Sequence, residues 1–206
     1  MSASSTVWQG AGRRIHMQEV GTRDGLQMEQ AFVPTEDKIA LVNALSDAGL
    51  SKIEVTSFTS PTAIPALRDA EIVMREITRL PGTVYTALVP NVRGAERAIE
   101  ARTDELNLVM SASETHNISN LRMTREQSFA SLAQVVATAQ AAQVAVNVSL
   151  SCVFGCPMEG NVHASAVFDW VQRFADLGVR GITLCDTTGM AYPTQVHQLT
   201  TAARAR

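Results

Sequence analysis

The sequence has few cysteines, and none of them belongs to a recognisable metal motif. Its three cysteines are an odd number, and Cys152 and Cys156 have a C-x3-C spacing that matches no common zinc site. We therefore expect reduced thiols in a cytosolic protein, with Cys185 as a small buried residue. The four histidines form no H-x-H or H-E-x-x-H spacing either, and only His116 lies just beyond a predicted strand. Each histidine is expected to be structural.

Concentrated positive charge and long hydrophobic runs are also missing. The formal net charge is −3, and basic residues cluster only at Arg13-Arg14 and at the terminal Arg204 and Arg206. Nucleic-acid binding needs a concentrated basic face, so we expect no nucleic-acid partner. The longest apolar runs, such as QVAVNVSL, are broken by polar residues well short of a membrane span, so we expect no membrane partner.

The remaining composition is that of an ordinary globular protein, with 46% hydrophobic and 18% charged residues. A chain of 206 residues can bury one sizeable core, so we expect one folded domain, residues 14–206, behind a flexible N-terminal arm, residues 1–13. The arm is Ser-rich and free of acidic residues, as transit peptides are, but it is short and lacks an amphipathic period. The cytoplasm is therefore the expected location, and the mitochondrial matrix is the alternative.

Behind the arm, strand-like and helix-like segments alternate along the chain. Strands are predicted over residues 14–21, 51–58, 83–91, 104–111, 144–154 and 180–189. Helices are predicted over residues 35–50, 64–80, 92–102, from 124 onward, 165–178 and 192–206. Thr35 and Gly49 are the expected N-cap and stop of the first helix, and Thr124 with Gln127 forms a capping box. This alternation predicts an α/β fold in which crossover helices connect a parallel sheet.

Both a doubly wound sheet and a (β/α)8 barrel fit the alternation. No Gly-x-Gly-x-x-Gly follows the first strand, which argues against a dinucleotide-binding sheet. Polar residues stand at or just beyond the C-terminal ends of the strands, where a barrel gathers its catalytic groups. They are Arg23, Asp24, Glu54, Ser57, Asn91, Ser111, Glu114, Ser151 and Asp186. We predict a (β/α)8 TIM-barrel type with about six of the eight units, because a full barrel needs about 250 residues.

The segment EVGTRDGLQ places Arg23 and Asp24 between Gly21 and Gly25, which would allow tight turns. A carboxylate at a barrel mouth is a hard oxygen ligand suited to Mg²⁺ or Mn²⁺. The guanidinium beside it can stabilise an enolate or oxyanion without losing its charge. The alternative is a solvated surface ion pair of little energetic value.

Two further acids are candidates for the same mouth. Glu54 lies in the apolar strand KIEVTSF, and its neighbours Ile53 and Val55 should point the opposite way, so Glu54 is predicted to face the barrel interior. A buried carboxylate needs a partner, and Arg23 is a plausible one; a purely structural ion pair is the alternative. Asp186 ends GITLCDTTG, where it is predicted either to cap the following turn or to act as an acid/base group.

Five segments, EVGTRDGLQ, KIEVTSFTSP, LVPNVRG, SCVFGCPMEG and LCDTTG, together resemble the 3-hydroxy-3-methylglutaryl-CoA lyases. These enzymes belong to the metal-dependent Claisen-type lyases and synthases on TIM barrels. The similarity extends from about Ile15 to Pro193, and RDGLQ with CPMEG is typical of the lyase branch. It implies retro-Claisen cleavage of 3-hydroxy-3-methylglutaryl-CoA to acetoacetate and acetyl-CoA, in leucine degradation and ketone body metabolism. A related 3-hydroxyacyl-CoA such as citramalyl-CoA is the alternative substrate.

The resemblance also implies a role for each matching residue. Arg23 corresponds to the arginine that polarises the substrate carbonyl, Asp24 to a ligand of the divalent metal, and Glu54 to the acid that orients the arginine. Asp186 corresponds to an acid that handles protons. The partners implied are an acyl-CoA substrate and, in the full-length form, a second copy in a homodimer. The residues expected to bind substrate are Arg23, Gln27, Ser57, Asn91 and Ser111.

Members of this family also carry a His-x-His pair on strand seven, a polar ligand on strand eight and a cysteine on a Gly-rich loop. All of these correspond to positions beyond Arg206. The expectation is therefore a C-terminally truncated barrel that by itself holds metal weakly and turns over poorly. A non-catalytic barrel remnant, which binds a partner or a separately supplied C-terminal half, is the alternative.

Overall fold

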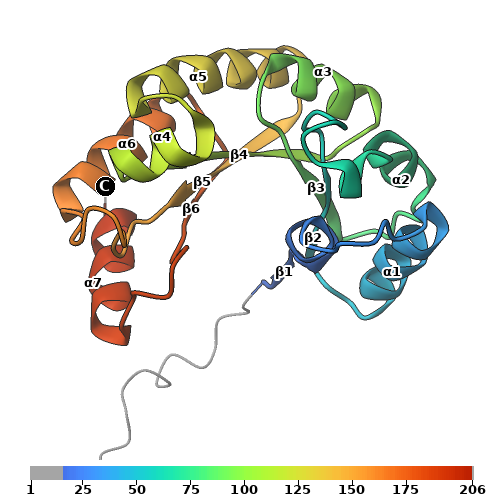
Figure 1. Cartoon of the computed structure of the whole chain (residues 1–206), viewed down its shortest axis with the longest axis horizontal. Helices are drawn as coiled ribbons and strands as arrows, with labels where there is room; N and C mark the ends of the chain where they lie inside the picture. Colours follow the sequence, from blue (N-terminus) through green and yellow to red (C-terminus); the bar gives the residue numbers. More distant parts are fainter. Residues whose placement is uncertain (1–15, 206) are drawn as a thin grey trace, which may run out of the picture.

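A computed structural model of the protein describes residues 16–205, which contain a single parallel sheet of six strands. The strand order is β1-β2-β3-β4-β5-β6, so each strand pairs with its neighbours in sequence. The sheet curls into an arc, and the helices lie along its outer side (Figure 1). This half-barrel confirms the predicted architecture. The predicted arm, residues 1–13, lies outside the described residues, and no helix among those described is long and apolar enough to cross a membrane.

The strands and helices alternate much as predicted. The strands are β1 (Gln18–Glu19), β2 (Lys52–Ser57), β3 (Val84–Leu88), β4 (Glu105–Ser111), β5 (Ala145–Ser151) and β6 (Gly181–Leu184). The helices are α1 (Thr35–Asp47), α2 (Ala70–Glu76), α3 (Val92–Glu100), α4 (Glu114–Leu121), α5 (Arg125–Ala141), α6 (Ala164–Asp176) and α7 (Pro193–Arg204). Two short helical turns, the π-turn η2 (Gly21–Gly25) and the 3-10 turn η3 (Pro65–Leu67), complete the described elements.

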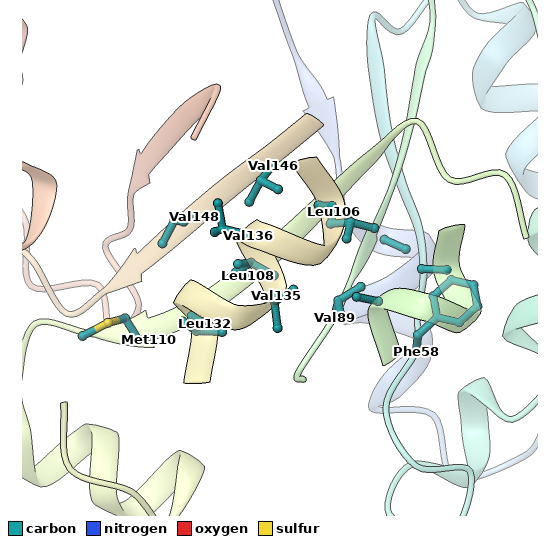
Figure 2. Packing of buried hydrophobic residues seen from close by; sticks show 14 of the residues in the cluster. Phe58, Val89, Leu106, Leu108, Met110, Leu132, Val135, Val136, Val146 and Val148 are labelled. Atoms are coloured by element: carbon teal, nitrogen blue, oxygen red, sulfur yellow. The ribbon is translucent and has the colours of Figure 1, made fainter. Parts of the chain in front are cut away.

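Side-chain alternation on the central strands separates the core from the concave face of the sheet. On β4, Leu106, Leu108 and Met110 are fully buried, whereas Asn107 and Val109 line a cavity on the concave side. Helix α5 covers the outer face with Leu132, Val135 and Val136 (Figure 2). Full burial of each such side chain contributes about 1.5–3 kcal/mol, so the outer face stabilises the sheet and leaves the inner face available for polar groups.

The segment predicted as one helix over residues 64–80 is instead divided into η3 and α2. Lys38 on α1 is buried here, and its Nζ donates to the Ala66 carbonyl (2.6 Å) and to Asp69 Oδ1 (2.7 Å). Ala66 lies in η3, where its carbonyl accepts from the Lys38 side chain, and Pro65 has no N–H with which to continue a helix. The division of the predicted helix thus coincides with Pro65 and with a long-range ion pair between Lys38 and Asp69.

Two predicted helix starts had different outcomes. The capping box is confirmed: Thr124 accepts from the backbone N–H of Gln127, whose side chain accepts from the Thr124 N–H. Thr35 is not the N-cap of α1, because Pro34 occupies that position and the Thr35 hydroxyl donates to Asp69 Oδ2 (2.8 Å). The predicted stop is confirmed, since Gly49 follows α1 with a φ of 83°.

Candidate active site

A cavity of about 820 Å³ lies at the C-terminal ends of the strands, on the concave side of the sheet. Five of the predicted site residues line it, from three separate parts of the chain. They are Arg23, Asp24, Gln27, Glu54 and Asp186. The convergence supports the barrel-mouth interpretation, because an extended sheet would have spread these groups along one edge.

Arg23 and Glu54 form a buried two-point ion pair at the floor of the cavity. Arg23 donates from Nε to Glu54 Oε1 (3.0 Å) and from Nη2 to Oε2 (3.4 Å). The Glu54 side chain is 1% exposed and that of Arg23 is 15% exposed. The prediction that Glu54 faces the interior and pairs with Arg23 is confirmed. Such a planar fork fixes the direction of the guanidinium as well as its charge.

Asp24 occupies the solvent side of the same guanidinium. Its Oδ1 accepts from Arg23 Nη1 at 2.6 Å, while 64% of the Asp24 side chain is exposed. An exposed carboxylate that opens on the cavity suits a divalent cation with oxygen ligands. Residues 16–205 contain no group of three or more His, Cys, Asp and Glu residues placed to hold a metal. By its chemistry Asp24 fits as one oxygen ligand of a divalent cation, and the described residues bring no further two such groups beside it.

The turn that presents Arg23 and Asp24 does not depend on glycine in the way that the sequence predicted. Neither Gly21 nor Gly25 has a positive φ, and a Cβ on Gly25 would meet no heavy atom within 4 Å. Gly21 is confined instead by Glu19, whose Oε1 accepts from the Gly21 N–H at 2.6 Å. A Cβ on Gly21 would approach that oxygen to 3.0 Å, so a side chain there would require the Glu19 carboxylate to shift.

Backbone and hydroxyl contacts anchor the turn η2 to strand β2. The Val20 carbonyl accepts from the N–H groups of Arg23 (3.0 Å) and Asp24 (2.7 Å). Thr22, which is 1% exposed, donates its hydroxyl to the Glu54 carbonyl at 2.7 Å. Thr22 thus forms a hydrogen bond to the backbone of Glu54, the residue whose side chain orients Arg23. These contacts hold the guanidinium and its carboxylate in a fixed relation.

Asp186 both lines the cavity and caps a turn. Its Oδ1 accepts from the Met190 N–H (2.9 Å) and its Oδ2 from the Ala191 N–H (3.2 Å). Asp186 therefore caps the turn, as one of the two predictions stated. Its position on the cavity wall is compatible with the other prediction, an acid/base group. The neighbouring Cys185 is less buried than predicted, since its side chain also lines the cavity. Burial raises the pKa of the Cys185 thiol.

Three residues predicted to bind substrate lie outside the cavity lining. Asn91 is the N-cap of α3, and its side chain accepts from the Gly94 N–H at 2.9 Å. Ser57 is 1% exposed, and its hydroxyl donates a hydrogen bond to the Thr59 hydroxyl. It follows the register shift between β2 and β3 in the sequence. Ser111 is 2% exposed and donates to the Ser151 carbonyl. Their polar groups are engaged in local structure.

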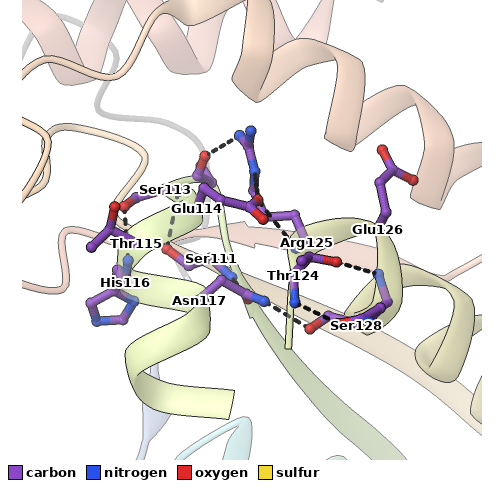
Figure 3. A network of polar contacts seen from close by, with 12 residues as sticks. Ser111, Ser113, Glu114, Thr115, His116, Asn117, Thr124, Arg125, Glu126 and Ser128 are labelled. Atoms are coloured by element: carbon purple, nitrogen blue, oxygen red, sulfur yellow. Dashed lines mark hydrogen bonds and ion pairs between the residues drawn. The ribbon is translucent and has the colours of Figure 1, made fainter. Parts of the chain in front are cut away.

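The segment after β4 forms a polar network that explains the position of Ser111 (Figure 3). Asn117 is fully buried, and its Oδ1 accepts from the Ser111 N–H at 2.9 Å. Its Nδ2 donates to the Met123 carbonyl and to Ser128 Oγ, both at 2.8 Å. This network belongs to α4, a helix that the sequence analysis did not predict. His116 on the same helix lines the cavity, and its buried Nδ1 has no hydrogen-bond partner.

Neither thiol of the C-x3-C segment reaches the cavity. Cys152 and Cys156 are buried, and Ser113 Oγ donates to Cys156 Sγ at 3.1 Å. Burial raises the pKa of the Cys156 thiol, but hydrogen bonds from Ser113 and from the backbone at Met158 and Glu159 outweigh it and lower the pKa. The partners that lower it are distant in sequence or depend on the loop conformation, so the spacing alone gave no sign of the shift.

Polar side chains of β4 to β6 also line the cavity. Ser151 had been placed at a strand end by the sequence, whereas Asn107, Ser149 and Thr183 had not been identified. The signal was available, because polar residues occupy alternate positions in ELNLVMS and AVNVSLS, where the intervening residues are apolar. These side chains stand within the strands rather than beyond their ends, and they form part of the cavity wall.

Comparison with known proteins agrees with this geometry. A family model described as HMGL-like matches residues 14–206. The hydroxymethylglutaryl-CoA lyase YngG of Bacillus subtilis (strain 168) is 45% identical over 194 residues, covering 94% of this chain and 65% of that protein. The mitochondrial hydroxymethylglutaryl-CoA lyase of Gallus gallus is 38% identical over 190 residues, covering 92% of this chain and 64% of that protein.

A similar solved structure is an HMG-CoA lyase from Acinetobacter baumannii in complex with coenzyme A and 3-methylmalate. It matches with a TM-score of 0.88 and 48% identity, covering 92% of this chain and 62% of that chain. The present chain thus spans between 54% and 65% of the length of the curated relatives that it matches. The half-barrel corresponds to part of the TIM barrel of these lyases. On the family match and these relatives together, the chain belongs to the HMGL-like family.

Proposed function

We propose that the protein to which this chain belongs is a carbon–carbon lyase that cleaves 3-hydroxy-3-methylglutaryl-CoA to acetoacetate and acetyl-CoA. The observation that carries the proposal is the fixed guanidinium of Arg23, which buried Glu54 aligns at a cavity shared with Asp24 and Asp186. The cavity volume of about 820 Å³ is within the range usual for small-molecule sites. The relatives named above as lyases for this substrate give independent support.

In the proposed reaction the tertiary hydroxyl of the substrate loses its proton. The bond between the hydroxyl-bearing carbon and the α-carbon of the thioester then breaks, and its electron pair moves onto the α-carbon to give the enolate of acetyl-CoA. The hydroxyl-bearing carbon becomes the ketone of acetoacetate, and the enolate takes up a proton. The chemistry therefore needs a stabiliser for the enolate oxygen and a group that moves protons.

Arg23 has the donors needed to stabilise the enolate. A guanidinium has five N–H donors, and Nε, Nη1 and Nη2 each donate one to a carboxylate. One N–H on each terminal nitrogen is left for a substrate oxygen. Because Glu54 fixes the plane of the guanidinium beforehand, no reorganisation is needed when negative charge develops on the thioester oxygen.

The remaining roles belong to Asp24, Asp186 and Gln27. A divalent metal, Mg²⁺ or Mn²⁺, supplies Lewis-acid polarisation of the substrate oxygens when bound, and Asp24 is the residue proposed to hold it. Asp186 is proposed to accept the hydroxyl proton, since a carboxylate that receives two backbone N–H groups keeps further lone pairs. Gln27, on the cavity wall just after η2, is proposed to contact the substrate.

We also propose that the full-length protein is a cytoplasmic homodimer acting in leucine degradation and ketone body metabolism. Relatives with mitochondrial and with cytoplasmic names both exist, so fractionation of the source cells is the relevant measurement. Sedimentation of the purified full-length protein would test the dimer. A monomer would contradict it.

The test of the function is release of acetyl-CoA by the purified full-length protein and by the 206-residue chain. We expect the full-length protein to cleave 3-hydroxy-3-methylglutaryl-CoA in Mg²⁺ or Mn²⁺, and EDTA to abolish the activity. Asp24→Asn should abolish the metal-dependent activity, whereas Asp176→Asn, at a carboxylate that accepts from Gln172 on α6, should not. No cleavage by the full-length protein, or cleavage of citramalyl-CoA alone, would contradict the proposal.

A further inference from the structure

A continuous layer of hydrogen-bonded side chains crosses the inner face of the half-barrel. Asn107 Nδ2 on β4 donates to Glu54 Oε1 on β2 at 3.2 Å. Asn147 Nδ2 on β5 donates to Asn107 Oδ1 (3.0 Å) and approaches Thr183 Oγ1 on β6 (3.1 Å). Ser149 Oγ also donates to Asn107 Oδ1, at 2.9 Å. Side chains of three strands, β4, β5 and β6, are thus connected to the Glu54 carboxylate of β2 that aligns Arg23.

The contacts of Asn107 determine which way its amide points. Its Oδ1 accepts from both Asn147 and Ser149, which leaves only the NH₂ group to face Glu54. A flipped amide would place oxygen against the Glu54 carboxylate and nitrogen against the Asn147 NH₂ group, losing two of these bonds and creating repulsion. Asn147 and Ser149 on β5 therefore determine that the NH₂ group of Asn107 faces Glu54.

The bond from Asn107 ends on the same oxygen that receives Arg23. Glu54 Oε1 accepts from Asn107 Nδ2 and from Arg23 Nε, and β3 lies between the two strands that carry Glu54 and Asn107. Glu54 and Asn107 are 1% and 3% exposed, so the protein almost completely encloses both side chains. The two-point fork holds Arg23 and Glu54 relative to each other, and the bond from Asn107, the third donor to this carboxylate, ties the pair to β4.

We propose that Asn107 is a positioning residue for the lyase reaction. Its amide, oriented by Asn147 and Ser149, holds the Glu54 carboxylate in the plane in which the remaining N–H groups of Arg23 face the substrate. This inference rests on the proposed function for its kinetic consequence, but the effect on Arg23 itself is independent of activity. Asn107 acts through Glu54 and is assigned no contact with the reacting atoms.

The kinetic test uses Asn107→Leu in the full-length protein, because leucine has a similar size and no donor. Loss of one hydrogen bond to a charged group predicts a fall in kcat of about tenfold or more, with a smaller change in KM. In a Glu54→Ala background the same substitution should have no further effect on kcat, since its target is absent. Asn107→Ser, whose hydroxyl is too short to reach Glu54, provides a second variant if the leucine variant fails to fold.

Asn117→Leu is the matched control. Asn117 is also a buried asparagine with three side-chain hydrogen bonds, but none of them involves Glu54. Its substitution should lower the melting temperature, and any loss of kcat should multiply with that of Glu54→Ala. A purely structural role for Asn107 would give the same multiplicative behaviour, and that result would overturn the inference.

Hydrogen exchange of the Arg23 Nε–H, followed by NMR and assigned through its loss in Arg23→Lys, gives a readout without turnover. We expect faster exchange in Asn107→Leu and Asn107→Ser than in the wild type, and no change in Asn117→Leu. Unchanged exchange in both Asn107 variants would overturn the positioning role even if the protein proved inactive. Faster exchange in the Asn107 variants, together with a wild-type protein that cleaves no acyl-CoA, would instead support positioning and reject the proposed function.

Discussion

Substitution of Arg23 by lysine tests the central feature of the site while keeping the positive charge. Arg23 donates to Glu54 Oε1 and Oε2 and to Asp24 Oδ1, over distances of 3.0, 3.4 and 2.6 Å. A lysine has a single nitrogen, which cannot span both oxygens of Glu54, reach Asp24 and face the substrate at once. Loss of one donor to a developing oxyanion lowers kcat by roughly 10²–10³-fold, which is about 2.7–4 kcal/mol.

The assay is steady-state release of acetyl-CoA by the full-length protein, together with thermal unfolding. We expect Arg23→Lys to stay folded, because lysine can still form an ion pair with the buried carboxylate of Glu54. Arg173→Lys is the matched control: Arg173 forms an equally forked pair with Glu126, at 2.7 and 2.7 Å, on the outer helices. A kcat for Arg23→Lys near that of the control would remove Arg23 from the proposed mechanism.

Three further predictions concern stability. Leu108→Ala, at a fully buried position of β4, should lower the free energy of unfolding in urea by about 2–5 kcal/mol; a smaller loss would mean that the outer face of the sheet repacks easily. Lys38→Met should cost about 3–5 kcal/mol by leaving Asp69 buried without its cation, and Lys38→Met combined with Asp69→Leu should recover part of it. Hydrogen bonds from Arg173 hold the pKa of Glu126 below its usual range, so this pair stabilises the fold above the usual carboxylate pKa and loses its effect as pH falls through the lowered value. Glu126→Gln should therefore lower the melting temperature slightly at neutral pH and converge with the wild type in acid; a constant difference at all pH values would contradict this reasoning.

Features that depend on neighbours in the chain were predictable from the sequence. The six alternating units, the Thr124 and Gln127 capping box and the Gly49 helix stop follow from local periodicity and backbone geometry. The inward position of Glu54 follows from the two-residue alternation of a strand, and its pairing with Arg23 follows because a buried carboxylate requires a cation. Most of these inferences succeeded because each uses one physical rule over a short stretch of sequence. The pairing of Arg23 with Glu54 spans 31 positions and succeeded because the strand order places β2 beside β1, the strand that Arg23 follows.

Features that depend on groups brought together by curling of the sheet were decided only by the tertiary structure. Asn107 meets Glu54 across 53 positions and Asn147 across 40. The alternation within each strand marks these polar positions but does not show which of the side chains meet. Nor does the sequence show that Lys38 and Asp69 form an ion pair where a predicted helix is divided. The sequence by itself determined that an arginine and three carboxylates would stand at strand ends. The curvature of the sheet decided which polar groups complete the site, because it set the distances over which hydrogen bonds can form.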